Sequence, residues 1–305
     1  MEKSILDPAP IALFTFNRLR HTQDTVGALQ SNKLSASSDL FVFSDGPRHA
    51  GEAATITAVR EYITTIEGFK SVSCIERTGN LGLAASIIAG VTDIVNRYGR
   101  VIVLEDDMIT SPYFLQYMND ALQLYQDEER VVSVHGYVYP VSQALPETFF
   151  LRGADCWGWA TWKRGWDLFE ADGRKLLQEL EKQSLGFQFD YDGTYGFTDM
   201  LKDQIHGRNN SWAIRWNASA FLKDKLTLYP GRSLVLNTGL DSSGVHSGSK
   251  QDFLTTVAQE PVQVLKIAPE ENRTAREAFK VFFRSRKPSA VRQFINRVKY
   301  IFSRL

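Results

Sequence analysis

The sequence has few cysteines, no long apolar run and no recognisable leader. Only two cysteines occur, Cys74 and Cys156, and they are far apart in the 305-residue chain. Two isolated thiols are typical of a reduced protein and do not indicate a disulfide framework or a cysteine metal site. No stretch approaches the roughly 18–20 consecutive apolar residues of a membrane span. Residues 1–10 are polar and the apolar run at 11–16 is too short for a signal peptide, so we expect a cytoplasmic protein.

Two phosphate-binding motifs are also missing. After the first apolar run the chain reads Asn17-Arg-Leu-Arg20, where a dinucleotide-binding dehydrogenase has a Gly-x-Gly-x-x-Gly turn. The Gly-rich lysine motif of P-loop enzymes is absent as well. Nucleotidylyltransferases normally have a Gly-rich, basic loop at this point, and the sequence offers none. Dehydrogenases and P-loop enzymes are thereby excluded, and a nucleotidylyltransferase is a disfavoured alternative.

The net charge is zero, but the charge is unevenly distributed. Residues 276–305 contain nine Lys or Arg and one acid, Glu277, so this segment carries +8 and the rest of the chain −8. Apolar residues from Val291 to Leu305 recur at helical spacing on one face. A basic amphipathic helix of this kind favours an anionic membrane surface. Its rich Phe and Ile content argues against nucleic acid, and docking on the acidic body of the protein stays open.

What is present is an alternation of short apolar runs and helical patterns over the first 135 residues. It predicts strands at 11–16, 40–43, 72–76, 101–104 and 131–134, and helices at 22–30, 52–65, 83–98 and 112–125. This is the pattern of an α/β fold with a mixed, mainly parallel sheet flanked by helices. Beyond Pro140 the alternation breaks down, and we expect helices at 174–183 and 199–206 and strands at 212–216 and 226–229. We divide the chain into 1–135, an irregular second half at 136–268, and a tail at 269–305 that ends in the amphipathic helix.

Polar groups follow three of the predicted strands at their carboxyl ends. They are Asn17-Arg18, Asp45 and the triplet Glu105-Asp106-Asp107. Ligands of open parallel sheets bind outside this edge, so we expect the three groups to lie together. A carboxylate there can hold Mg²⁺ or Mn²⁺, which in turn stabilises the charge of a departing diphosphate. Arg18 could add a fixed positive charge or be an ordinary surface ion pair.

Five short motifs occur in a characteristic order. They are Phe14-Thr-Phe-Asn-Arg18, Phe43-Ser-Asp-Gly-Pro47, Asn80-Leu-Gly-Leu-Ala84, Val103-Leu-Glu-Asp-Asp-Met108 and Ser111-Pro-Tyr-Phe114. In this order they resemble the nucleotide-sugar half of GT-A (Rossmann-like) glycosyltransferases. The acidic triplet is similar to that of the N-acetylglucosaminyltransferase I type. The resemblance covers about residues 10–135 and fades afterwards, where only family-2-like features remain.

The resemblance implies a role for each matching residue. Asp107 would bind the metal, Asp106 would face the ribose, and Glu105 would lie near the donor sugar or acceptor. Thr15, Asn17 and Arg18 would belong to the nucleotide-sugar site, with Arg18 on the phosphates. Asp45 would contact the base, usually uracil. Asn80 and Gly82 would line the loop beside the donor.

The catalytic base has to come from the second half, where the resemblance is weakest. An inverting transferase needs a carboxylate to take the proton of the acceptor hydroxyl. Asp203 is our first choice, because it stands shortly before Trp212-Ala-Ile-Arg-Trp216, and Asp199 is the second. An exposed helix acid is the equal alternative for Asp203. The remaining candidates in this half are Asp192 and Asp241.

Two further features of the second half have two interpretations each. His246 follows a Gly- and Ser-rich loop and could touch the metal, as a histidine does in several GT-A enzymes, or be structural. The tryptophans from Trp157 onward could form an acceptor platform or belong to the core.

Together these features predict a metal-dependent, inverting glycosyltransferase. It would move a sugar from a nucleoside-diphosphate sugar, most simply a UDP-sugar, to a glycan or lipid-linked glycan. A non-catalytic carbohydrate- or nucleotide-sugar-binding protein on the same fold is the competing hypothesis.

Overall fold

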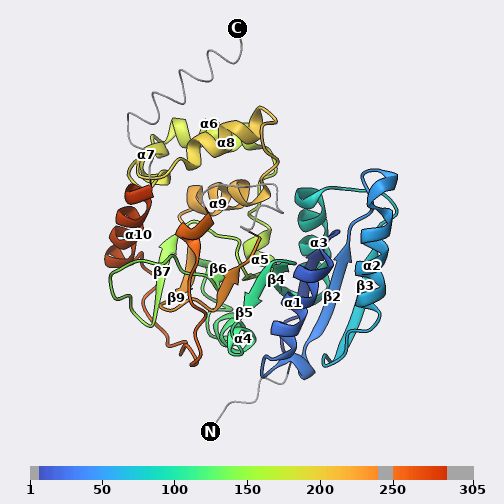
Figure 1. Ribbon diagram of the computed structural model, residues 1–305. Coiled ribbons are helices and arrows are strands. Elements are labelled where there is room, and N and C mark those ends of the chain that lie inside the picture. The colour runs from blue at the N-terminus through green and yellow to red at the C-terminus, as the bar shows by residue number, and fades with distance from the viewer. Residues whose placement is uncertain (1–6, 240–249, 287–305) are drawn as a thin grey trace.

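The computed structural model describes residues 7–239 and 250–286, and its centre is an eight-stranded sheet with helices on both faces (Figure 1). The strand order is β3-β2-β1-β4-β8-β6-β9-β7, and β10 and β5 form a separate pair. The strands are β1 (Ile11–Thr15), β2 (Asp39–Ser44), β3 (Ser71–Glu76), β4 (Arg100–Glu105), β5 (Met108–Thr110), β6 (Val131–His135), β7 (Thr148–Arg152), β8 (Trp159–Trp162), β9 (Leu226–Pro230) and β10 (Val235–Asn237). The helices are α1 (Leu19–Gln30), α2 (Ala53–Ile63), α3 (Leu83–Tyr98), α4 (Phe114–Leu124), α5 (Lys163–Trp166), α6 (Gly173–Lys182), α7 (Gly186–Phe189), α8 (Phe197–Ile205), α9 (Trp212–Leu222) and α10 (Arg273–Arg286). Short 3-10 turns lie at Ser35–Ser37, Ala50–Glu52 and Lys250–Phe253.

The sheet is mixed, with four parallel and three antiparallel neighbouring pairs. Strands β3, β2, β1 and β4 are mutually parallel, and so are β6 and β9. Strand β8 runs antiparallel to both β4 and β6, and β7 runs antiparallel to β9. The expected α/β class with a mainly parallel sheet is therefore confirmed. Strands from both sides of residue 135 share this one sheet.

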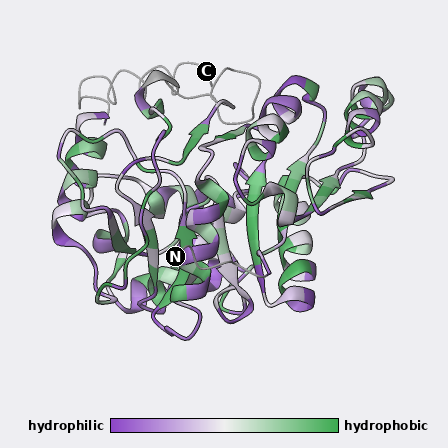
Figure 2. Ribbon diagram, turned by 90° about the horizontal axis from the view of Figure 1, so that it is seen from below, coloured by the Kyte–Doolittle hydropathy of each residue, from purple (hydrophilic) through white to green (hydrophobic). Residues whose placement is uncertain are grey.

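Alternate strand residues fill two core layers because both faces of the sheet are covered. In β1, Ile11 and Leu13 face α1 and α4, while Ala12 and Phe14 face α3. Most strands are coloured as hydrophobic in Figure 2, as are parts of the helices that cover them. Helix α3 ends at Gly99, whose φ of 75° is the left-handed conformation that glycine adopts without strain.

Most tryptophans of the second half belong to the core. Five are buried. The rings of four contact one another around β8, α5 and α9: Trp159, Trp166, Trp212 and Trp216. Trp162 belongs to the other core layer, where its Nε1 donates to the Leu122 carbonyl oxygen of α4. Only Trp157 is partly exposed. The core interpretation therefore holds for these five.

The strand predicted at 212–216 is wrong, because this segment is the start of helix α9. The alternation of Trp212, Ile214 and Trp216 has the period of a strand, but α9 is buried on nearly all sides and has no polar face to reveal its helical period. The side chain of Ser211 accepts a hydrogen bond from Ile214 N and caps the helix. Strands β5, β7, β8 and β10 had not been expected either, and the helix predicted from residue 112 begins at Phe114.

The described part of the tail packs on the protein itself. The apolar face of α10 contributes Phe279, Phe282 and Phe283 to a cluster with Phe149 and Tyr229. The amphipathic helix predicted for 290–305 lies outside the described residues. Within residues 7–239 and 250–286, no helix is long and apolar enough to cross a membrane.

Candidate active site

The acidic triplet lies at the carboxyl end of β4, where the sequence predicted it. Glu105 is the last residue of the strand, and Asp106 and Asp107 form the turn into β5. The hydroxyl of Thr25, from α1, donates to the Asp106 carbonyl oxygen at 2.8 Å and accepts from Met108 N at 3.1 Å. Both aspartates are buried. The turn is thus fixed by a side chain that sequence reasoning did not single out.

Arg18 lies between β1 and α1 and reaches across to both aspartates. Its Nη2 donates to Asp107 Oδ2 at 2.7 Å and also to Asp106 Oδ1. Burial lowers the pKa of Arg18, but the charges and hydrogen bonds of the two carboxylates outweigh this effect and raise it. The guanidinium is therefore a permanent cation. Of the three polar groups expected at the carboxyl ends of the strands, Arg18 and the acidic triplet are therefore in contact.

Like charges crowd the triplet. Burial, together with the charges of Asp107 and Asp106, raises the pKa of Glu105 to about 8. Burial also raises the pKa of Asp106 to about 6, although Arg18 opposes the shift. Glu105 is thus mostly protonated at neutral pH, and the single guanidinium of Arg18 faces two aspartates, so the site favours a further positive charge.

The aspartates have unused ligand atoms for a cation. Asp106 Oδ2 and Asp107 Oδ1 are buried and have no hydrogen-bond partner in the described chain. Among the residues described, no group of three or more His, Cys, Asp or Glu is arranged to enclose a metal ion. Mg²⁺ typically takes one or two protein carboxylates and completes its shell with water and substrate phosphates. The residues present fit a cation of that kind.

A segment far along the chain covers Asp107. Strand β10 pairs with β5, and beyond it Thr238 N donates to the Asp107 carbonyl oxygen at 2.8 Å. A Cβ on Gly239 would lie 2.0 Å from Asp107 Oδ2, so only glycine allows this approach. Sequence reasoning missed both residues, because nothing local marks them. His246 and Asp241, which follow in the chain, lie outside the described residues.

Asp45 binds the loop in front of α3. Its carboxylate accepts from Leu81 N and Gly82 N, each at 2.9 Å, and Asn80 Nδ2 donates to the Gly46 carbonyl oxygen at 2.8 Å. Gly82 has a φ of 78° and starts the helix. Asp45 N in turn donates to the Thr15 carbonyl oxygen at 3.2 Å. These residues connect the ends of β1 and β2 with α3, and their contacts with a nucleotide stay predictions.

The remaining candidates are Asn17, next to Arg18, and three aspartates farther along the chain. Asn17 is half-buried in the turn after β1. Asp203 lies on α8 and pairs with Arg208, whose Nε donates to its carboxylate at 2.6 Å. Asp199 is exposed in the first turn of α8, with its carboxylate beside Gly196. Asp192 is bound by Arg276 and Lys280 of α10. The described residues show no direct contact of these aspartates with the triplet.

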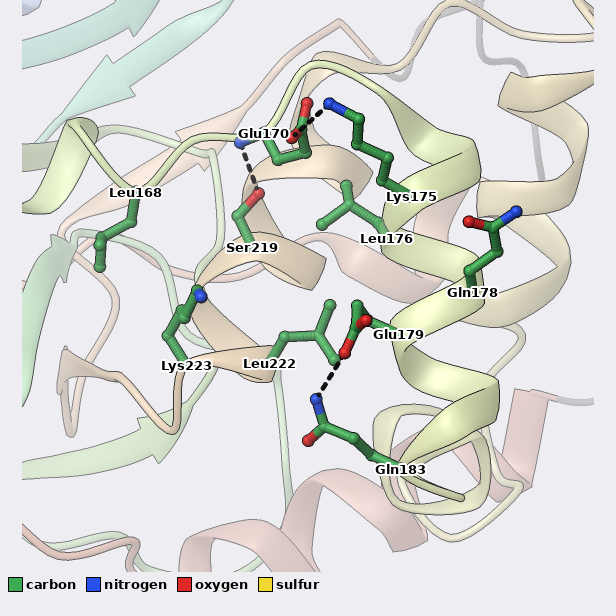
Figure 3. A pocket seen from close by; sticks show the side chains of 10 residues that line it. All are labelled: Leu168, Glu170, Lys175, Leu176, Gln178, Glu179, Gln183, Ser219, Leu222 and Lys223. Carbon is green, nitrogen blue, oxygen red and sulfur yellow. Dashed lines mark hydrogen bonds and ion pairs between the residues drawn. The ribbon is translucent and has the colours of Figure 1, made fainter.

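A pocket of about 340 Å³ lies elsewhere, between α6, α9 and the segment before α6 (Figure 3). Its wall mixes apolar side chains with charged ones such as Glu170, Lys175 and Glu179. It contains none of the residues that the sequence singled out.

Comparisons with known proteins assign no family to the chain. No protein-family model matches it, and no similar curated protein was found. The structure of mannosyltransferase PcManGT from Pyrobaculum calidifontis in complex with GDP-Man and Mn²⁺ has 15% identity and a TM-score of 0.31, covering 45% of this chain and 39% of that one. A UDP-glucose pyrophosphorylase complexed with UDP-glucose has 12% identity and a TM-score of 0.36, covering 73% and 90%. The chain thus spans about two fifths of the mannosyltransferase's length, and these likenesses are too weak to support an argument about function.

Proposed function

We propose that the protein is a metal-dependent glycosyltransferase that uses a nucleoside-diphosphate sugar, most simply a UDP-sugar. The observation that supports this best is the grouping of Arg18, Asp106 and Asp107 at the carboxyl edge of the sheet. One carboxylate oxygen of each aspartate is buried and has no hydrogen-bond partner among the described residues. Paired acids with spare oxygens suit a cation, and an adjacent guanidinium suits a phosphate.

Each group has a distinct task in this proposal. Asp107 would hold Mn²⁺ or Mg²⁺, with Asp106 oriented toward the ribose and Asp45 toward the base. The bound cation would supply Lewis acidity that stabilises charge on the departing diphosphate. Arg18 would exchange a carboxylate contact for a contact with a phosphate oxygen. Its positive charge does not depend on pH in the physiological range, so it is always available to the phosphate.

Transfer would invert the anomeric carbon. The acceptor oxygen attacks that carbon as its proton passes to a carboxylate, and the bond to the diphosphate oxygen breaks. Asp203 is the proposed base and Asp199 the second candidate. Asp203 would first have to leave Arg208, whereas no described residue donates a hydrogen bond to the Asp199 carboxylate.

The acceptor would be a glycan or a lipid-linked glycan, bound by residues 136–268. The nucleotide half would be 1–135. Attachment to the inner face of the cytoplasmic membrane through the basic tail at 269–305 belongs to the same proposal, and so does a metal contact of His246. Nucleic acid is not among the proposed partners.

The test is donor binding with and without metal. We expect UDP with Mn²⁺ to raise the melting temperature, since a ligand at about 100 times its dissociation constant stabilises by about 2.7 kcal/mol. In Asp107→Asn, metal-dependent UDP affinity should fall at least about tenfold, because a neutral amide is a poor ligand for a hard cation. UDP-, GDP- and dTDP-sugars are then compared for Mn²⁺-dependent hydrolysis.

The matched control is Asp167→Asn, which removes an exposed carboxylate paired with Lys163. It should bind UDP and Mn²⁺ like the wild type. Equal metal-dependent binding by Asp107→Asn would overturn the site assignment. Release of pyrophosphate from a sugar phosphate and UTP would instead favour a nucleotidylyltransferase.

A further inference from the structure

The turn before β8 reaches the same sheet edge as the triplet. Strand β8 runs antiparallel to β4, with Trp159 opposite Val103, so β8 begins at the edge where β4 ends. The turn is held there by β6, since Gly136 N donates to the Gly158 carbonyl oxygen at 2.7 Å and Trp157 N to His135 Nε2 at 3.0 Å. The chain thus brings Asp155, Cys156 and Trp157 to the ligand-binding edge.

Asp155 is a fixed carboxylate in this turn. Its Oδ1 accepts from Cys156 N at 2.9 Å, and its Oδ2 accepts from the Tyr139 hydroxyl at 3.3 Å. The side chain keeps 25% of its surface exposed. Neutral donors therefore orient the group while leaving part of it open to a ligand.

No lysine or arginine of the described residues forms an ion pair with Asp155. The imidazole Nε2 of His135 lies 4.0 Å from Asp155 Oδ1 and is fully buried. Burial lowers the pKa of His135, although Asp155 opposes the shift, so the imidazole is neutral at pH 7. Among the described residues, Asp155 thus has no cationic partner, unlike Asp192 and Asp203.

Aromatic side chains surround this carboxylate. Besides burial, the charge of Asp155 raises the pKa of Tyr139, Tyr195 and Tyr229, which come from three different parts of the chain. Tyr139, Tyr195 and Trp157 are partly exposed. We call Asp155, Tyr139, Tyr195 and Trp157 the Asp155 cluster. It combines a charged hydrogen-bond acceptor with three partly exposed aromatic rings, each of which also packs against Phe253 or Phe283. The exposed part of these rings can contact the apolar face of a sugar.

The Asp155 cluster and the acidic triplet share one electrostatic environment. Besides burial, the charges of Asp155, Glu105 and Asp107 all raise the pKa of the Cys156 thiol. The pairing of β8 with β4, which sets Trp159 opposite Val103, independently brings this turn to the end of β4 that carries the triplet. Besides burial, the charges of Asp155 and Cys156 raise the pKa of Tyr195, which stands two residues before α8.

We propose that the Asp155 cluster is the acceptor subsite, in which the Asp155 carboxylate accepts hydrogen bonds from hydroxyls of the acceptor sugar. This proposal rests on the proposed function. If the protein is a glycosyltransferase, a sugar bound beside the triplet is the acceptor of the transferred sugar. Asp155 binds and orients the acceptor, and the proton of the reacting hydroxyl still passes to an acid of α8.

The test measures sugar binding directly by saturation-transfer NMR, without turnover. The probes are methyl glycosides of glucose, galactose, mannose and N-acetylglucosamine, each with UDP and Mg²⁺. We expect the wild type to bind at least one of them. Asp155→Asn should weaken that binding about tenfold, the size of a lost charge-assisted hydrogen bond. Tyr139→Phe, which removes only the supporting hydroxyl, should weaken it about two- to threefold.

Asp167→Asn is again the matched control and should bind the glycoside like the wild type. Unchanged melting temperatures of the variants show that the fold is intact. Absence of any signal from the wild type, or equal affinity in Asp155→Asn, overturns the subsite. A parallel UDP titration separates the two proposals. If Asp155→Asn loses glycoside binding but still binds UDP, the effect is confined to the acceptor subsite. If the wild type does not bind UDP, the proposed donor site is refuted.

Discussion

Three carboxyl groups and one guanidinium share a small volume between β1 and β4, and their charges decide how the site behaves without ligand. The pKa of Glu105, about 8, lies above its ordinary value of 4.5. A raised carboxyl pKa means that the folded chain binds this proton more tightly than the unfolded chain. The stability it contributes is present at low pH and is lost as the pH rises from 4.5 toward 8.

Replacing Glu105 by Gln should remove this loss. We expect metal-free Glu105→Gln to be more stable than the wild type at about pH 9, by an amount on the order of 1 kcal/mol, and to show a smaller advantage at about pH 5. Urea unfolding with EDTA at both pH values measures the difference. A variant that gains no stability at high pH would show that Glu105 is well solvated.

The sequence could predict which residues stand at strand ends, but not the partners that the fold supplies from elsewhere. Arg18, Asp106 and Asp107 were foreseen because each follows an apolar run, and parallel strands end at one edge. Thr238, Gly239 and Asp155 were not, since they reach the site through the β5–β10 pair and the turn before β8. Such pairings are long-range and leave no local pattern.

The loop that joins β3 to α3 depends on Asp45. This carboxylate accepts hydrogen bonds from the backbone of Leu81, Gly82 and Gly46. Asp45→Ala would leave these N–H groups without their acceptor, at a cost of about 1–3 kcal/mol.

We therefore expect Asp45→Ala to have a lower free energy of unfolding in the absence of any nucleotide. Hydrogen exchange at the amides of Leu81 and Gly82 should accelerate, while exchange in α4 should not. An unchanged exchange rate at the Leu81 amide would mean that Asp45 does not stabilise the loop and acts only in ligand binding.

Helices α3 and α9 show where sequence patterns succeed and where they fail. Helix α3 was predicted at its observed bounds because its apolar residues lie on one face and Gly99 ends it. Helix α9 was mistaken for a strand because its exposed face is almost absent. Burial from all sides removes the polar half of the pattern on which a periodicity argument depends.

Strand β8 pairs with β4 on one side and with β6 on the other, and so joins the two groups of parallel strands. The tryptophans packed around it stabilise this junction. Trp159 is fully buried and its ring contacts those of Trp166, Trp212 and Trp216. Trp159→Ala should lower the free energy of unfolding by about 3–5 kcal/mol, because it removes a large buried side chain and leaves a cavity.

Chemical denaturation followed by far-ultraviolet circular dichroism measures this loss. Phe187→Ala is a suitable control, since Phe187 is 66% exposed, and it should change stability by less than about 0.5 kcal/mol. A loss of similar size in both variants would contradict a central role for Trp159.

The pairing of β5 with β10 ties Asp107 to Thr238, which is 131 residues away in the chain. A fragment that stopped near residue 135 would retain the acids and Arg18 but lose this clamp. It would also lose β8, leaving β4 as a bare edge on which other chains could assemble. Residues 1–135 therefore do not form a module that can be transferred alone. A chimera that exchanges them must also exchange the segment from β10 to Gly239.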